Sequence, residues 1–305
     1  MLRIAHISDL HVLPQAGVEW RQMLVNKRLT GYANFVLRRG RVHRREYLLA
    51  VLAAATEADH VVVTGDITNL AFESEFNEAR RLFDEIARTV EVTVIPGNHD
   101  IYLPQVQRER RFERHFSRFL ESDLPDLAVD VPAGRYPCVK LRGPAAIIAL
   151  SSAVPRPPFI AAGYLGSAQL EAFTKVLLHP EVASRTPVIL IHHPSVDTRC
   201  RLAQLRDGLV DGASFRTALA PLARGLVLFG HLHVRVRCVL RTSAGTLDVV
   251  GASGAALDHS DRSMRAGFNL YRMDTGGLTT VESHVLDESG KSLYQTMLEE
   301  RPGCR

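Results

Sequence analysis

The sequence lacks closely spaced cysteines and long apolar runs, and these absences exclude several classes of protein. Four cysteines are scattered over 305 residues without any CxxC pair, which indicates reduced thiols and neither a disulfide framework nor a zinc knuckle. No apolar run approaches the roughly 20 residues that a membrane-spanning helix needs. A strand is predicted from residue 2, which leaves no room for a secretory signal. We therefore expect a cytoplasmic protein.

Acidic residues are missing from one stretch of the chain. Residues 21–45 contain eight arginines and lysines and no aspartate or glutamate. The net charge of the whole chain is only +4, so the remainder of the sequence carries a net negative charge. Because the basicity is local, we expect no general nucleic-acid-binding surface.

The composition is otherwise that of a globular protein, with 46% hydrophobic and 23% charged residues. Short apolar runs alternate with helical spacing in the first part, and strands predominate from residue 226 onward without a linker between the two parts. We expect an α/β fold in which residues 1–305 form a single domain, with two sheets packed face to face and helices outside. A basic and apolar insertion with three aromatic residues interrupts this order at about residues 12–45.

Hydrophobic periodicity predicts the individual elements. Near-continuous apolar runs are typical of strands covered on both faces, and amphipathic spacing is typical of helices on the outside of a fold. Strands are expected at 2–7, 60–64, 92–96, 145–150, 187–191, 226–229, 234–241, 246–250, 268–273 and 278–285. Helices are expected at 46–57, 72–89, 105–121 and 167–178, and the Pro- and Gly-rich stretch 125–144 is expected to be loop or edge structure.

Five of the apolar strands are each followed by residue types that bind metals. These segments are Asp9-Leu10-His11, Gly65-Asp66, Gly97-Asn98-His99-Asp100, His192-His193 and Gly230-His231-Leu232-His233. Any one of them alone is also compatible with an ordinary turn or a buried loop histidine. Open α/β sheets bind their ligands at the carboxyl ends of strands, so the five together predict one site at an edge of the fold.

The residue types in these five segments limit which metal ions can bind. Carboxylate, amide and imidazole donors together suit Mn, Fe, Zn or Co, and the absence of cysteine from the five segments argues against a structural zinc site. Seven candidate ligands are too many for one tetrahedral ion but suit two ions that share a carboxylate. The candidates are Asp9, His11, Asp66, Asn98, His192, His231 and His233.

These segments resemble the motifs of the calcineurin-like metallophosphoesterase superfamily. Its pattern of D-x-H, GD, GNHD or GNHE, H and GHxH occurs here in the same order between residues 9 and 233. The resemblance implies a four-layer αββα sandwich of two mixed β-sheets flanked by helices, with two metal ions. The implied ligands are Asp9, His11, Asp66 and His233 for one ion, and Asp66, Asn98, His192 and His231 for the other.

The resemblance also implies a role for His99, which would bind a phosphate oxygen and protonate the leaving alkoxide. Many members continue the second motif to G-D-x-x-D, and that last carboxylate pairs with the catalytic histidine. Asn69 stands at this position here. Its side-chain carbonyl oxygen would orient the imidazole, but a neutral amide would stabilise an imidazolium less well. We expect Asn69 and His193 on the substrate side, with His193 at the pocket rim. The other histidines, His43 among them, are expected in surface or core positions without a role.

The implied activity is that of a metal-dependent phosphoesterase, most directly a phosphodiesterase acting on a small diester or nucleotide. Cyclic nucleotide phosphodiesterases are the nearest analogy. Protein phosphatases of the superfamily typically have the motifs GDxxDRG and GNHE, whereas this chain has GDITN and GNHD. Phosphoprotein phosphatase activity is therefore disfavoured.

Two alternatives remain open. Basic and apolar residues at 20–45 suit a lipid-bearing anionic substrate or peripheral contact with the inner face of an anionic membrane. That mixture favours a UDP-linked lipid pyrophosphate hydrolase of the lipid A pathway type, acting on a nucleotide-lipid. A non-catalytic interaction scaffold, such as the retromer subunit with this fold, is the other alternative. It is disfavoured because inactive relatives usually lose ligands, and all seven are retained here.

Overall fold

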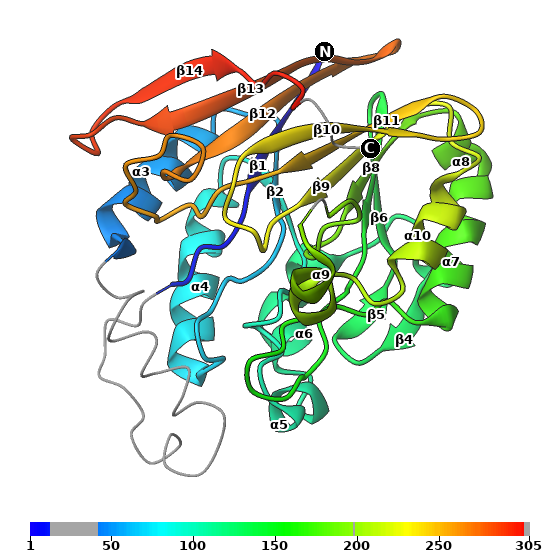
Figure 1. Cartoon of the computed structure of the whole chain (residues 1–305), viewed down its shortest axis with the longest axis horizontal. Coiled ribbons are helices and arrows are strands. Elements are labelled where there is room, and N and C mark those ends of the chain that lie inside the picture. Colours follow the sequence, from blue (N-terminus) through cyan, green and yellow to red (C-terminus); the bar gives the residue numbers. More distant parts are fainter. Residues whose placement is uncertain (13–41, 198, 302–305) are drawn as a thin grey trace.

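Two large β-sheets form the centre of the computed structural model, which describes residues 1–12, 42–197 and 199–301 (Figure 1). The first sheet has the order β14 (Leu293–Met297), β13 (Gly277–Leu286), β12 (Gly267–Asp274), β1 (Leu2–Ile7), β2 (His60–Val63) and β3 (Glu91–Val94). The second has the order β10 (Val236–Arg241), β11 (Thr246–Gly251), β9 (Leu226–Phe229), β8 (Thr186–Leu190), β7 (Ala145–Ala149) and β6 (Cys138–Arg142). Both sheets are mixed: β1 is parallel to β2 but antiparallel to β12, and β8 is parallel to β9 while β6 is antiparallel to β7.

Helices surround the two sheets, and several of them cover the outer faces. Those of the described residues are α3 (Arg45–Ala55), α4 (Glu73–Ile86), α5 (Pro104–Arg108), α6 (Arg111–Phe116), α7 (Ser167–Leu178), α8 (Pro180–Ala183), α9 (Arg201–Asp207) and α10 (Gly212–Leu219), with the short 3-10 helices η3 (Ser117–Leu120) and η4 (Pro125–Leu127). In Figure 1, α3 and α4 lie beside the first sheet, and α7, α8 and α10 beside the second. This is the predicted four-layer αββα sandwich, so the predicted fold class is confirmed.

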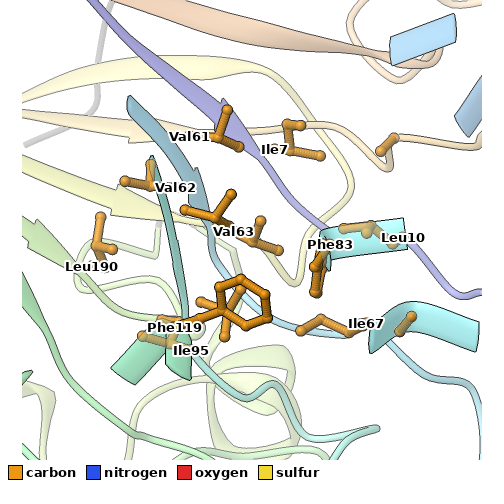
Figure 2. Packing of buried hydrophobic residues seen from close by; sticks show 14 of the residues in the cluster. Ile7, Leu10, Val61, Val62, Val63, Ile67, Phe83, Ile95, Phe119 and Leu190 are labelled. Carbon is orange, nitrogen blue, oxygen red and sulfur yellow. The ribbon is translucent and has the colours of Figure 1, made fainter. Parts of the chain in front are cut away.

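Strand side chains alternate between two packed layers. In β7, Ile147 belongs to the cluster between the sheets, whereas Ile148 packs with Phe173 of α7 on the outer side. Figure 2 shows the layer between the sheets, where Val62 of β2 lies on the same side as Leu190 of β8. Successive side chains of a strand point to opposite faces, so the near-continuous apolar runs belong to strands that are covered on both sides.

The structure differs from the predicted elements in several places. The single helix predicted at 105–121 is divided into α5, α6 and η3, because Arg110 has a left-handed φ of 48° and interrupts the helical backbone. The short elements α8, α9, α10 and β14 have no predicted counterpart. Of these, α9 and β14 bury none of their residues and so give no apolar pattern. The stretch 125–144 is edge structure, as predicted, with the hairpin β4 (Val129–Val131) and β5 (Gly134–Tyr136) followed by β6.

Most of the insertion predicted at about residues 12–45 lies outside the described residues, as does most of the segment 20–45 for which membrane contact is predicted. Both stay predictions, and so does the single domain of residues 1–305. No helix within the described ranges has the length and apolar character needed to cross a bilayer.

The cysteines only partly match the expectation of reduced thiols. Cys138 and Cys200 are free, whereas Cys238 is disulfide-bonded. The expectation was wrong for Cys238 because spacing along the sequence does not reveal which thiols approach each other in the fold.

An ion cluster joins the sheets at the edge where β3 faces β6. Glu91 of β3 accepts a hydrogen bond of 2.9 Å from Lys140 and bonds of 2.5 and 2.6 Å from Arg142. Burial opposes the charge of Glu91, but the hydrogen bonds from Arg142, His60 and Lys140 hold its pKa well below the ordinary value. Lys140 is only 5% exposed, so its ammonium group depends on this carboxylate.

We expect Glu91→Gln to lower the free energy of unfolding by about 2 kcal/mol at pH 7, because it leaves a buried ammonium without its carboxylate. Urea unfolding measures the change. The loss should shrink as the pH falls below 4.5, the ordinary pKa of this group, since the stabilisation from the depressed pKa of Glu91 is complete only above that value and declines gradually below it. Glu85→Gln removes an exposed pair with Arg81 and should have little effect; equal losses in both variants would contradict the prediction.

Candidate metal centre

The five predicted segments meet where the strands of both sheets end. β1, β2 and β3 are parallel neighbours in the first sheet, and β8 and β9 are parallel neighbours in the second. Each of these strands is followed by a short turn that carries candidate ligands. The structure therefore brings together seven side chains that are spread over most of the sequence.

One group of four candidates comes from the turns after β1, β2 and β9. Asp9, His11, Asp66 and His233 each offer a ligand atom within 4.8 Å of the others. The Nε2 atom of His233 lies 3.2 Å from Oδ1 of Asp9 and 3.4 Å from Nε2 of His11. An ion bound about 2.1 Å from each of two donors places those donors about 3.0–3.4 Å apart. The observed separations therefore fit a shared metal ion.

The remaining three candidates lie beside Asp66. The Nε2 atom of His192 is 3.4 Å from Oδ1 of Asp66 and 3.1 Å from Oδ1 of Asn98. The rings of His192 and His231 lie edge to face, with centroids 5.1 Å apart. Asp66 belongs to the first group and contacts the second, so its carboxylate is placed to be shared by two ions.

A backbone carbonyl fixes the orientation of His192. Its Nδ1 donates a hydrogen bond of 2.6 Å to the carbonyl oxygen of Thr64. A carbonyl oxygen only accepts, so Nδ1 carries a proton and Nε2 is directed toward Asp66 and Asn98. Metal-ligating histidines are typically held by this kind of second contact.

The turns that carry the candidates have an unusual backbone. Among the described residues, eight non-glycine positions have a left-handed φ, and five of them are Asp9, His11, Asp66, His231 and His233. Such conformations cost about 1–3 kcal/mol each and persist only where surrounding contacts impose them. Their concentration at the candidate ligands indicates that the fold holds these side chains in place at the expense of stability.

Glycines allow the turns to approach each other closely. A Cβ atom on Gly97 would lie 2.2 Å from Oδ1 of Asp66, and one on Gly230 would lie 1.8 Å from Oγ of Ser8. No side chain fits at either point. The glycines of the GNHD and GHLH segments are therefore required by the packing of one turn against another.

Burial makes the charges of the site depend on one another. Asp9 is 0% exposed and Asp66 is 2% exposed. Burial, followed by the negative charge of Asp66, raises the pKa of Asp9 to about 7. Burial opposes a charge on His192, but Asp66 raises its pKa to about 9. Two buried carboxylates among imidazole and amide donors are a set that divalent metal ions complement.

His99 and Asn69 are in contact, but not through the predicted atoms. The Nδ1 atom of His99 donates to the main-chain carbonyl of Asn69 at 2.5 Å, and its ring stacks on Tyr102 with centroids 5.5 Å apart. The side-chain amide of Asn69 instead donates to the carbonyl oxygens of His11 and Val12 at 3.0 and 3.1 Å. Asn69 therefore orients His99 through its backbone and joins two turns through its side chain.

His193 lies deeper than the rim position predicted for it. The side chain is 0% exposed, its Nδ1 is 2.8 Å from Oγ of Ser152, and its Nε2 donates to the carbonyl oxygen of Ala161 at 2.8 Å. A Cβ atom on Gly163 would lie 2.2 Å from its ring. Burial lowers the pKa of His193 to about 3. In this structure the ring is a neutral link between three segments, which corrects its placement at the rim.

Two residues without a predicted role also belong to the site. The carboxylate of Asp100 accepts hydrogen bonds from the backbone N–H groups of Ile67, Thr68 and Gly97 and from the hydroxyl of Thr68, at 2.8–3.1 Å. Asp100 therefore joins the turn that carries Asp66 to the turn after β3. In the sequence, Asp100 is marked only as the last residue of the GNHD segment. The ring centroids of His43 and His11 lie 5.0 Å apart; no apolar run directly precedes His43 in the sequence, so the strand-end pattern does not reveal it.

Comparison with known proteins gives one family, one relative and two solved structures. The family model described as calcineurin-like phosphoesterase matches residues 2–235. A probable cyclic nucleotide phosphodiesterase of Rhodococcus erythropolis is 26% identical over 295 residues, which cover 94% of this chain and 80% of that protein. A dimetal phosphatase from Danio rerio has a TM-score of 0.56 at 13% identity, covering 98% of this chain and 99% of that chain.

A purple acid phosphatase from seeds of yellow lupin (Lupinus luteus) has a similar fold. Its TM-score is 0.59 at 11% identity, with 96% of this chain and 52% of that chain covered. At such low identities, the two solved structures are evidence about the fold alone.

We expect Asp100→Ala to lower the free energy of unfolding by about 3 kcal/mol, because it removes the acceptor of three buried backbone N–H groups. It should also weaken the binding of added Mn²⁺ by about 10–100-fold, since two ligand-bearing turns lose their connection. Urea unfolding and metal titration measure the two effects. Asp126→Ala, at an exposed aspartate, is the matched control; unchanged stability and metal affinity in Asp100→Ala would show that this carboxylate does not hold the turns.

Proposed function

The chain belongs to the calcineurin-like phosphoesterase family, and we propose that it is a phosphodiesterase that hydrolyses a small phosphodiester or nucleotide with two metal ions. Membership of the family makes it a metal-dependent hydrolase of phosphoester bonds. The observation that carries the proposal is the meeting of seven oxygen and nitrogen donors, which are Asp66 and three others on each side of it. Preference for diesters is supported by the Rhodococcus relative, which is named a probable cyclic nucleotide phosphodiesterase.

We assign the donors to two ions that share Asp66. The ligands of the first ion are Asp9, His11, Asp66 and His233, and those of the second are Asp66, Asn98, His192 and His231. Mn, Fe, Zn and Co suit this mixture of carboxylate, amide and imidazole groups. When bound, two such ions supply a hydroxide nucleophile from water near neutral pH and neutralise charge on the phosphate.

The protein supplies orientation and a proton. His99 donates its Nδ1 proton to the carbonyl of Asn69, so Nε2 is the atom that exchanges a proton with the leaving group. Its stacking on Tyr102 keeps the ring plane fixed. A neutral carbonyl stabilises an imidazolium less than a carboxylate does. We therefore expect a substrate whose leaving group needs only modest help from His99, such as a nucleotide phosphate.

Of the two alternative functions, the non-catalytic scaffold is disfavoured and the lipid pyrophosphate hydrolase stays untested. A non-catalytic scaffold has no need of two buried carboxylates, oriented imidazoles and five left-handed backbone positions in one place. The UDP-linked lipid pyrophosphate hydrolase depends on the basic segment 20–45, most of which lies outside the described residues, and stays a prediction.

Activity should require both metal ions and Asp66. We expect metal-free protein to gain hydrolysis of bis-p-nitrophenyl phosphate and of cyclic nucleotides on addition of Mn²⁺, and Asp66→Ala to abolish it, because neither ion then has its shared ligand. A panel that also contains a monoester and a UDP-linked lipid measures the preference. Asp126→Ala should keep wild-type rates. Faster turnover of the monoester than of every diester would contradict the proposal.

The effect of His99→Ala on the rate of hydrolysis should depend on the leaving group of the substrate. We expect the rate on an alkyl phosphodiester to fall by about 10²–10⁴-fold, and the rate on an aryl diester to fall much less, since a phenolate leaves without protonation. The comparison of kcat for the two substrates measures this, with metal content determined in parallel. Small and equal losses on both would show that His99 is not the acid.

A further inference from the structure

Exposed apolar side chains gather on two neighbouring segments of the chain. Among the described residues, ten large hydrophobic side chains are exposed, and six of them come from residues 159–164 and 202–210. We call these six the apolar patch: Phe159, Ile160, Tyr164, Leu202, Leu205 and Val210. Single exposed hydrophobic residues are ordinary on a protein surface, whereas a group of them with polar neighbours marks a surface that binds a partner.

Main-chain hydrogen bonds hold the two segments of the apolar patch side by side. The N–H of Ala161 donates to the carbonyl of Arg206 at 2.8 Å. The N–H of Gly163 donates to the carbonyl of Gly208 at 2.9 Å. The carbonyl of Ala161 also accepts a hydrogen bond of 2.8 Å from Nε2 of His193, one residue beyond a candidate metal ligand. The two segments therefore form one surface, and this surface is attached to the metal centre.

Helix α9 turns its apolar side chains toward solvent. None of its residues is buried, and Leu202 and Leu205 are 79% and 68% exposed. Residues three apart lie on the same face of a helix. The helix is fastened through polar groups instead, since Nε2 of Gln204 donates at 2.8 Å to the carbonyl oxygens of Asp197 and Arg199. A helix that packs on its own domain turns its apolar face inward, so the leucine face of α9 is available to a partner outside the protein.

The other segment of the apolar patch presents an aromatic side chain. Phe159 is 83% exposed and has a left-handed φ of 69°. Pro157 and Pro158 precede it, and their rings fix φ, so the turn has little freedom to fold Phe159 back onto the protein. Side chains that stand this far out of the surface suit a fluid apolar layer, because a rigid partner would need a matching pocket for each of them.

The charge around the apolar patch indicates the kind of layer. Residues 154–164 and 199–212 contain four arginines and two aspartates. Asp207 pairs with two of the arginines, and Asp211 accepts hydrogen bonds from backbone N–H groups before α7. Arg201 is exposed at the start of α9. A net positive charge beside an exposed apolar face complements an anionic lipid surface, where apolar side chains enter the acyl boundary and arginines stay among the head groups.

We propose that the apolar patch docks the protein on a membrane surface that contains anionic phospholipids. Phe159, Leu202 and Leu205 enter the acyl boundary, and Arg201 lies among the lipid phosphates. This surface is separate in the sequence from the basic segment 20–45, for which membrane contact is predicted. Docking through the apolar patch holds the metal centre close to the membrane.

Co-sedimentation with vesicles tests the proposal without any substrate. We expect the full chain to bind vesicles of phosphatidylcholine and phosphatidylglycerol more tightly than vesicles of phosphatidylcholine alone, and less tightly at high salt. Leu205→Ser and Phe159→Ser should each weaken binding about tenfold, since each removes one side chain from the acyl boundary. Arg201→Ala should weaken binding to the anionic vesicles alone, by about fivefold.

Leu178→Ser is the matched control, because Leu178 is 74% exposed but lies at the C-terminal end of α7, outside the apolar patch. It should bind vesicles as the wild type does, and all four variants should keep the wild-type rate on bis-p-nitrophenyl phosphate. Absence of vesicle binding by the wild type, or wild-type affinity in both apolar variants, would overturn the proposal. So would a concentration-dependent dimer that Leu205→Ser abolishes, because a second copy would then cover the patch. Failure of the wild type to hydrolyse any phosphoester would instead contradict the proposed function, on which vesicle binding does not depend.

Discussion

The two buried carboxylates of the first sheet are bound by groups from the second, and the site depends on this contact. Asp9 accepts hydrogen bonds of 3.0 and 3.2 Å from the backbone N–H of His231, and Asp66 lies 3.4 Å from the imidazole of His192. Neither sheet holds a complete set of donors. The relative position of the sheets is therefore a condition for the metal centre, and the packed layer between them and the cluster around Glu91 stabilise that position.

The same arrangement opposes stability locally. Left-handed backbone at five candidate ligands, two carboxylates without solvent and glycines packed against neighbouring turns are all unfavourable when taken alone. They are tolerated because Asp100 and Asn69 connect the turns and because apolar layers lie on both faces of the strands behind them. The stability of the core thus compensates for holding two buried carboxylates close together among the imidazole and amide donors.

Much of the fold and the positions of the candidate ligands could be predicted from the sequence because carboxyl ends of parallel strands converge, whatever their separation along the chain. The pattern of polar residues at strand ends did not predict the directions in which the side chains point. His193 follows His192 directly but turns into the interior. Asn69 contacts His99 through its main-chain carbonyl, where its side-chain carbonyl was expected. His43 owes its place to backbone pairing with residues 256–258, and no local sequence pattern records such a contact.

The position of His43 has a consequence for the chain between it and His11. The N–H of Val12 donates to the carbonyl of Ile67, and the N–H of Arg44 donates to the carbonyl of Ala256. The chain on both sides of residues 13–41 is therefore held at the centre by main-chain hydrogen bonds. Because doubling the length of a loop costs only about 0.6 kcal/mol in closure entropy, insertions or deletions within that stretch would leave both attachment points and the ligands beside them in place.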